Sequence, residues 1–132
     1  MQQSAGEYMS VFLFGFFFYA LLEIAGRGYT HWTMGLLGGV SLMLLYSMER
    51  HLPAPRRVRA LYGALFITAS EFTVGVIDNL IMGWHVWDYS DRAGNLLGQV
   101  CPLFSVLWFL LCFPAQRICG LLYRRCHAFR SD

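Results

Sequence analysis

Four stretches of this chain are apolar over a length that can cross a lipid bilayer. A transmembrane helix needs about 20 consecutive, mostly apolar residues, and such runs cover residues 8–26, 32–49, 58–82 and 98–116. Only 14% of the residues are charged, whereas a soluble domain contains about 25%. The four runs leave almost no sequence for a soluble domain. We therefore expect residues 1–132 to form a single all-α domain of four transmembrane helices.

Arginine residues are concentrated at two places along the chain. The connection at residues 49–59 carries four of them and residues 117–132 carry four more, whereas the other two connections hold only Arg27 and Arg92. Basic residues mark the cytoplasmic side of a membrane protein. We therefore predict two helical hairpins in the plasma (cytoplasmic) membrane, with both termini inside and a basic cytoplasmic tail at 117–132. Pro114 is expected to bend or end the last helix before this tail.

The chain lacks residues that several kinds of site require. Lysine is absent, since all ten basic residues are arginine. This excludes P-loop, Schiff-base and kinase-type lysine sites, so ATP would have to be bound by a separate ATPase subunit. The motifs His-x-x-x-His, Cys-x-x-Cys and Gly-x-Ser-x-Gly do not occur. We expect no metal and no cofactor, and the arginine clusters indicate contact with anionic lipids rather than nucleic acid.

Two acidic residues, Glu71 and Asp78, lie inside the third apolar run. Charged residues are costly within a bilayer and almost always face the interior of a helix bundle. Small or polar residues recur here at helical spacing along one face: Ala64, Thr68, Glu71, Gly75 and Asp78. We therefore predict that this stripe faces the protein and not the lipid.

A third acid, Glu23 in the first run, is predicted at a depth similar to that of Glu71. With a rise of 1.5 Å per residue, both lie roughly 20 Å from the cytoplasmic edge, in the outer half of the bilayer. Asp78 and Asn79 are expected nearer the outer interface. These four residues form a candidate polar site for a cation, a proton or a cationic solute. In the alternative interpretation the acids are structural: they pair with Arg27 or Arg92, accept hydrogen bonds from neutral donors, or stay protonated.

The segment 83–101 is too polar to span a membrane and too aromatic to be a free linker. Its tryptophan and tyrosine side chains suit a membrane interface, so one interpretation is an interfacial anchor. The polar side chains crowded beside Asp78 and Asn79 favour a second interpretation, the mouth of a pocket. The candidate mouth residues are Trp87, Asp88, Tyr89, Arg92 and Asn95.

Residues 87–111, WDYSDRAGNLLGQVCPLFSVLWFLL, resemble a block found in a family of small multi-span membrane proteins. The matching features are W-D-Y-S, then Asn95, Gly98 and Cys101, and F-S-x-x-W at 104–108. An acid in the first run and a GVIDN-like end to the third are similar as well. The family is the CmpB-like family, which is labelled as type IV ABC transporters. The resemblance implies a multi-span membrane protein whose outer aromatic loop leads into the last helix.

Three functions fit these features. The leading hypothesis is a transporter-like or permease-like component with an acidic polar site in the outer half of the bundle. The alternatives are a membrane-embedded enzyme that acts on a lipid or an isoprenoid-like substrate, with carboxylates as acid and base, and a structural membrane subunit. Four short spans make a small wall for a solute pathway, so we expect a homo-oligomer in contact with membrane lipids.

Overall fold

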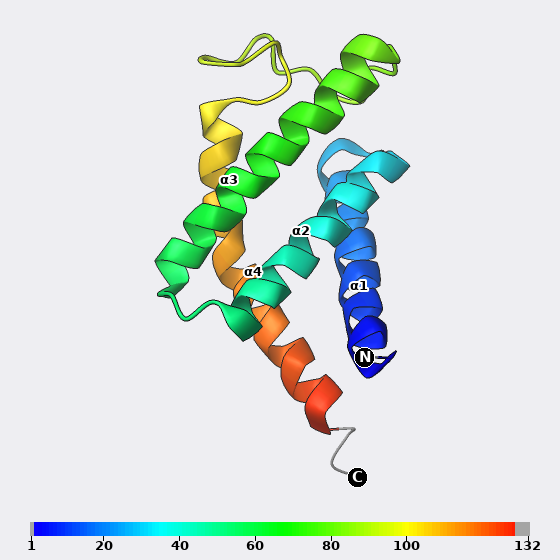
Figure 1. Ribbon diagram of the computed structural model, residues 1–132. Coiled ribbons are helices and arrows are strands. Elements are labelled where there is room, and N and C mark those ends of the chain that lie inside the picture. The colour runs from blue at the N-terminus through cyan, green and yellow to red at the C-terminus, as the bar shows by residue number, and fades with distance from the viewer. Residues whose placement is uncertain (1, 129–132) are drawn as a thin grey trace.

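The computed structural model describes residues 2–128, which form long helices joined by three connections. The helices are α1 (Gln2–Arg27), α2 (Trp32–His51), α3 (Arg56–Gly75), the π-helix η1 (Val76–Ile81) and α4 (Pro102–Ala128). Their direction alternates, so the start of α1, the 52–55 connection and the end of α4 lie at one end of the bundle, and residues 82–101 lie at the other (Figure 1). We call these the lower and upper ends. The prediction of an all-α fold is confirmed.

The helices pair as two antiparallel hairpins. α1 packs mainly on α2, and α3 packs mainly on α4. Glycines bring the first pair together, because a Cβ atom on Gly15 would lie 2.7 Å from the carbonyl oxygen of Gly38, and one on Gly38 would lie 2.4 Å from Cβ of Tyr19. Helices in lipid associate through small residues that allow such close approach.

Three of the helical segments are long and apolar enough to cross a membrane. They are Ala5–Arg27, Arg56–Ile81 and Pro102–His127. Each carries apolar side chains outward, as Phe17, Leu65 and Leu110 are all more than half exposed. The remaining helix, α2, contacts α1, α3 and α4 and buries nine of its 20 residues. Three helices therefore have the length and composition of a membrane span, and the fourth predicted span, α2, stays a prediction.

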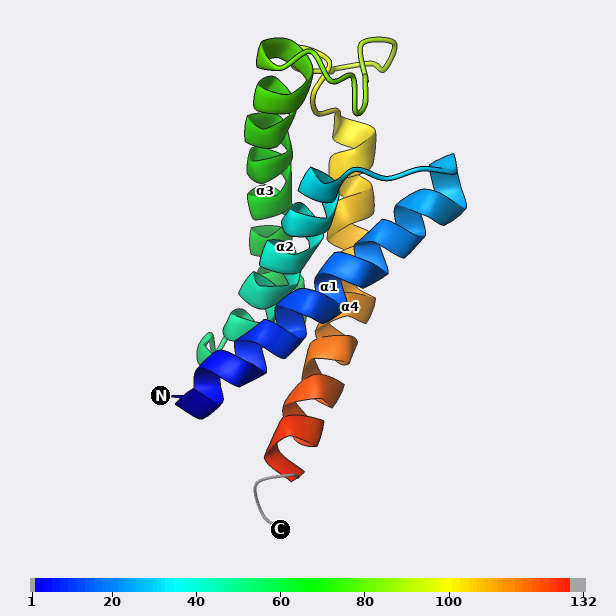
Figure 2. The same ribbon diagram turned by 90° about the vertical axis from the view of Figure 1, so that its right-hand side faces the viewer.

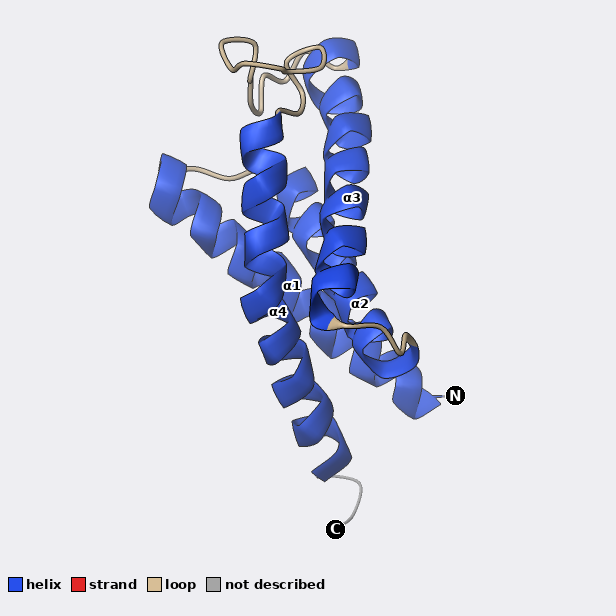
Figure 3. Cartoon of the chain, turned by 90° about the vertical axis from the view of Figure 1, so that its left-hand side faces the viewer, coloured by secondary structure: helices blue, strands red, loops and turns tan. Residues whose placement is uncertain are grey.

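α4 is longer than the last apolar run. It continues through Pro114 to Ala128, because a proline removes one backbone hydrogen bond and kinks a helix without always ending it. A change of direction is visible near the middle of α4 in two views (Figures 1 and 3). The predicted tail is therefore helical over 117–128, and residues 129–132 lie outside the described part. Residues 98–101, expected in the last span, belong instead to the preceding loop.

Buried side chains gather in two clusters. The lower cluster joins all four helices and contains Val11, Leu42, Leu45, Tyr46, Ala60, Cys112 and Cys119. The upper cluster joins Met34 and Leu37 of α2 to Val86 and Trp87 of the loop at 82–101. This loop, which we call the outer loop, is therefore packed onto the bundle, and Figure 2 shows it lying across the upper ends of α3 and α4.

Candidate functional site

Glu71 lies inside the upper half of the bundle, on the face of α3 that the sequence predicted to be buried. Only 1% of its surface is exposed. One carboxylate oxygen accepts a hydrogen bond from the Tyr89 hydroxyl at 3.0 Å, and the other accepts one from Nε1 of Trp108 at 2.9 Å. The acid therefore joins three separate segments, α3, the outer loop and α4, through two neutral donors.

The rest of the stripe on α3 also faces the protein, as predicted. Ala64, Gly75 and Asp78 are buried, and the half-buried Thr68 shares a hydrogen bond of 2.9 Å with the Ser105 hydroxyl of α4. Gly75 leaves space for the loop, since a Cβ atom there would lie 2.6 Å from the side-chain oxygen of Gln99. The spacing read from the sequence thus identified the contact face of α3.

The last turn of the third run is a π-helix, which the sequence did not predict. It holds Asp78 and Asn79, neighbours in sequence that are both buried. The wider turn of a π-helix changes the direction of successive side chains, and such turns are frequent at functional sites. Asp78 accepts a hydrogen bond of 2.6 Å from the hydroxyl of Thr33, at the start of α2.

Asn79 binds the outer loop from below. Its carbonyl oxygen accepts a hydrogen bond from the backbone N–H of Val86 at 2.6 Å, and its amide donates to the side-chain oxygen of Gln99 at 2.8 Å. Gln99 in turn accepts, on its backbone oxygen, a hydrogen bond from the Trp87 indole at 2.9 Å. Asp78 and Asn79 therefore lie beside the outer loop, as the sequence predicted for them.

Glu23 makes an ion pair and does not hydrogen-bond to Glu71. Nε of Arg27 donates to Oε2 of Glu23 at 2.7 Å, and Nη1 of Arg27 donates to the backbone oxygen of Val86 at 3.1 Å. Both residues of the pair are near enough to act electrostatically on Glu71. The pairing of an acid with Arg27, which we considered as the structural alternative, is confirmed for Glu23.

The five candidate mouth residues have different surroundings. Trp87 is buried, so it is a packing residue of the loop and not an interfacial anchor. Asp88 is exposed and accepts a hydrogen bond from the backbone N–H of Ser90. The guanidinium of Arg92 lies over the Phe104 ring, 5.6 Å from its centroid. Asn95 bonds to backbone atoms within the loop. Of the five, only Tyr89 hydrogen-bonds to a candidate acid.

Local contacts shift the pKa of two groups in the outer loop. Burial, followed by the nearby carboxylate of Glu71, raises the pKa of the Tyr89 phenol well above its usual range. Hydrogen bonding from the backbone of Ser90 lowers the pKa of Asp88. Tyr89 therefore keeps its proton and remains a donor to Glu71.

Several residues that complete the site were not among the sequence candidates. Thr33, Gln99 and Trp108 hydrogen-bond to Asp78, Asn79 and Glu71 in that order. Trp108 lies three residues after Ser105, which faces Thr68 of α3, so helical spacing gives its inward position a sequence signal. No sequence pattern points to Thr33, because its contact with Asp78 joins residues 45 positions apart.

A further buried acid, Glu7, lies at the lower end. It is 4% exposed and accepts a hydrogen bond from the Tyr46 hydroxyl, with Nη1 of Arg50 at 3.3 Å and Nε2 of His127 at 3.8 Å. This cluster ties α1, α2 and α4 together below the lower core. Sequence reasoning did not select Glu7, although Tyr46 and Arg50 are four residues apart and therefore share a helix face.

The upper polar residues thus form a layer of carboxyl, amide and hydroxyl groups between the bundle and the outer loop. Among the residues that the structure describes, no three His, Cys, Asp or Glu side chains are grouped as ligands of a metal ion. The layer can donate and accept hydrogen bonds, and Glu71 offers a carboxylate to a positively charged partner.

Comparison with known proteins identifies the family. Residues 6–130 match the CmpB family, described as "Putative ABC-transporter type IV". The chain belongs to this family. The match begins in α1 and includes the other helices, the outer loop and both polar clusters. The CmpB resemblance of residues 87–111 is therefore confirmed, and it extends over nearly the whole chain. No curated protein and no solved structure matched it.

Membership in the CmpB family and the apolar helices together make this an integral membrane protein related to ABC transporters.

Proposed function

We propose that this protein is the membrane component of a transporter, and that the layer around Glu71 binds a cation, a proton or a cationic solute. The observation that carries the proposal is the burial of Glu71 with two neutral donors, Tyr89 and Trp108. A buried acid is stable when it is paired with a positive charge or neutralised by a proton. The two neutral donors do not cancel the charge of Glu71, so this acid can still bind a cation or a proton.

In this proposal the outer loop is the cover of the site. Tyr89 occupies the side of the Glu71 carboxylate that faces the loop, and Asn79 and Arg27 hold the same loop through Val86. Movement of the loop would exchange the Tyr89 hydroxyl for a group of the solute. Asp78 and Asn79 would then line the path between the loop and Glu71.

The placement in the membrane follows from the direction of the helices and the distribution of arginine. We propose that α2 crosses the bilayer with the other three helices, because its 20 residues span about 30 Å and it lies between them. The lower end carries Arg56, Arg57 and Arg59. It would then lie on the cytoplasmic side of the plasma membrane.

We further propose that the protein works with other subunits. The family is described as an ABC transporter, and this chain has no lysine for a P-loop. A separate ATPase subunit would therefore bind the nucleotide, and the exposed Arg56 and Arg57 at the lower end offer it a docking surface. A second copy of the chain would widen the wall of the pathway.

The proposal is tested by measuring ligand-dependent stability of the purified protein in lipid nanodiscs. Na⁺, K⁺ and tetramethylammonium are titrated at constant ionic strength, and each series is repeated from mildly acidic to neutral pH. A ligand at 100 times its Kd raises the free energy of unfolding by about 2.7 kcal/mol. We expect one of these ions, or the proton, to raise the Tm of the wild type.

Two variants decide whether Glu71 is responsible. Glu71→Gln should fold and lose the response, whereas Glu49→Gln, which removes an acid paired with Arg59 at the lower end, should retain it. If Glu71→Gln lowers the Tm but leaves every response unchanged, Glu71 is a structural residue and the proposed site is wrong.

A further inference from the structure

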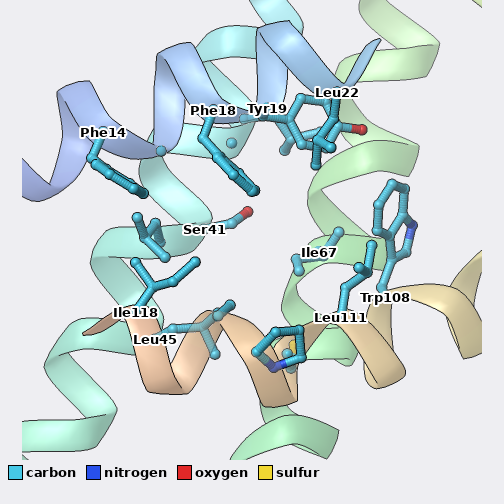
Figure 4. A pocket seen from close by; sticks show the side chains of 17 residues that line it. Phe14, Phe18, Tyr19, Leu22, Ser41, Leu45, Ile67, Trp108, Leu111 and Ile118 are labelled. Carbon is cyan, nitrogen blue, oxygen red and sulfur yellow. The ribbon is translucent and has the colours of Figure 1, made fainter. Parts of the chain in front are cut away.

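An apolar cavity lies below the polar layer, enclosed by α1, α2 and α4 with one residue of α3. Its volume is about 220 Å³. Figure 4 shows Phe14, Phe18 and Leu22 of α1 on one side of it, and Leu111 and Ile118 of α4 on the other. Of the packed helix pairs, α1 and α4 contact each other least, and Phe18, Leu22 and Leu111 are each more than 40% exposed. The cavity therefore opens sideways, between α1 and α4.

One polar atom is directed into this apolar space. Ser41 is 8% exposed, and its hydroxyl oxygen is buried without a hydrogen-bond partner among the described residues. Figure 4 shows this oxygen pointing into the cavity from α2. A helical serine commonly bonds to a backbone carbonyl one turn earlier, and a buried hydroxyl with no partner is unfavourable. Ser41 is therefore a group that an occupant of the cavity can satisfy.

A water molecule is a poor occupant. Buried waters typically make about three hydrogen bonds, and apolar cavities remain dry. The walls here are almost entirely apolar, and the indole N–H of Trp108 is already bonded to Glu71. Water beside Ser41 would have a single clear partner.

A lipid acyl chain also fits poorly. Ser41 is nine residues from the first residue of α2 and ten from the last, which corresponds to about 14 and 15 Å along the helix axis. If α2 spans the bilayer, Ser41 lies near the midplane, where acyl chains carry no oxygen. A chain would fill the space and leave the hydroxyl unsatisfied.

We propose that this cavity binds a small apolar molecule from the membrane that carries one hydrogen-bonding oxygen, and that this oxygen pairs with the Ser41 hydroxyl. A cavity of about 150 Å³ lined by apolar side chains binds benzene, so a cavity of 220 Å³ suits a bicyclic molecule. The rings of Phe14, Phe18 and Trp108 provide aromatic walls. This inference rests on the Ser41 hydroxyl and not on the carboxylate of Glu71 above the cavity, although Trp108 borders both sites.

The test uses two probes that differ by one hydroxyl group, 6-bromo-2-naphthol and 2-bromonaphthalene. Bromine quenches tryptophan fluorescence at close range, and Trp108 lines the cavity. The full-length protein in nanodiscs is titrated with each probe, and the Kd is corrected for partition into protein-free nanodiscs. The quenching signal is assigned to the cavity by its loss in Trp108→Phe.

We expect the wild type to bind the naphthol more tightly than the hydrocarbon by roughly threefold to tenfold, the typical effect of one hydrogen bond. Ser41→Ala should abolish this preference and leave the affinity for 2-bromonaphthalene unchanged. Ser47→Ala, on the same helix but outside the cavity, should behave like the wild type. Because the Ser41 hydroxyl has no hydrogen-bond partner among the described residues, Ser41→Ala should keep or raise the Tm, so a loss of binding cannot be attributed to unfolding.

Ala115→Leu, which places a larger side chain in the cavity from α4, should weaken both probes. Equal affinity for the two probes in the wild type would overturn the proposal. It would also be overturned if phosphatidylcholine with brominated chains quenched Trp108 fully and neither probe competed, since a lipid chain would then occupy the cavity. If the probes quenched Trp108 only in the monomer and not in a cross-linked dimer, a second copy of the chain would cover this face, and the proposal would also be overturned.

Discussion

The hydroxyl of Tyr89 lies 3.0 Å from Oε1 of Glu71, so the outer loop is joined directly to the buried face of α3. The two residues are 18 positions apart, and between them the chain completes α3 and η1 and enters the outer loop. Tyr89 also stacks on Phe104 at the start of α4, with ring centroids 4.6 Å apart. One side chain thus links the loop to both helices of the second hairpin.

Tyr89→Phe should destabilise the fold while preserving the stacking on Phe104. The change removes one of two hydrogen bonds to a buried carboxyl group, and we expect the free energy of unfolding to fall by about 1 to 3 kcal/mol. Unfolding in mild detergent, followed by circular dichroism, measures this. Tyr62→Phe is the control, because Tyr62 is 50% exposed on the same helix as Glu71, and it should change the stability little. Equal effects of the two substitutions would contradict the assigned role of Tyr89.

Stability should decline at alkaline pH, in part through Tyr89. Burial and the Glu71 carboxylate raise the pKa of this phenol in the folded protein, while in the unfolded chain it titrates near pH 10. The unfolded state therefore loses this proton first, and the contribution of Tyr89 to stability is present below about pH 10 and lost as the pH rises. In a Tm series from neutral to alkaline pH, Tyr89→Phe should show a shallower decline than the wild type. Parallel curves would show that Tyr89 does not contribute.

Gly38→Ala should weaken the first hairpin. The added Cβ would lie 2.4 Å from Cβ of Tyr19, and relief of such overpacking typically costs about 1 to 3 kcal/mol. The matched substitution Gly26→Ala places its Cβ where no neighbouring heavy atom lies within 4 Å. It should be neutral or stabilise α1 by up to about 1 kcal/mol through helix propensity. Thermal unfolding of both variants compares the two glycines, and a similar Tm would argue against the close contact of α1 with α2.

The orientation in the membrane can be measured by cysteine labelling in intact cells. Cys126 is the one partly exposed native cysteine among the four, so Cys126→Ser provides the background. A membrane-impermeant maleimide should label Asp91→Cys in the outer loop from outside and should label Pro53→Cys only after the cells are opened. Both positions are exposed, and neither change removes an arginine. The reverse pattern would place the outer loop in the cytoplasm.

The helical architecture and the buried face of α3 were predictable because both depend on local periodicity. Apolar runs of sufficient length specify helices in lipid, and the spacing of Ala64, Thr68, Glu71, Gly75 and Asp78 placed them on one side whatever the neighbour was. The packing of that side against the outer loop and α4 bears out the spacing. The π-helix at the end of α3 was not predictable in this way, because its wider turn is held by contacts with the loop.

The partners of the acids required the tertiary structure. Glu23 bonds to Arg27 within its own helix, which four-residue spacing allows one to anticipate. Glu71 could have faced Glu23, an arginine or a neutral donor, and the sequence did not distinguish these. The path of the outer loop decides which donor Glu71 meets, because it brings Tyr89 to this acid. The same path buries Trp87, although the aromatic composition of the loop alone suggested a membrane interface.

By itself, the sequence determined that this chain is a helical membrane protein with an inward acidic stripe, because hydrophobic length and helical spacing are local properties. The tertiary structure decided which groups meet that stripe, because Thr33, Tyr89 and Trp108 reach it only after the hairpins pack and the loop folds back. It also decided that Ser41 faces an apolar cavity. Hydrogen bonds between distant segments depend on where the whole chain places each donor, and no local pattern contains that information.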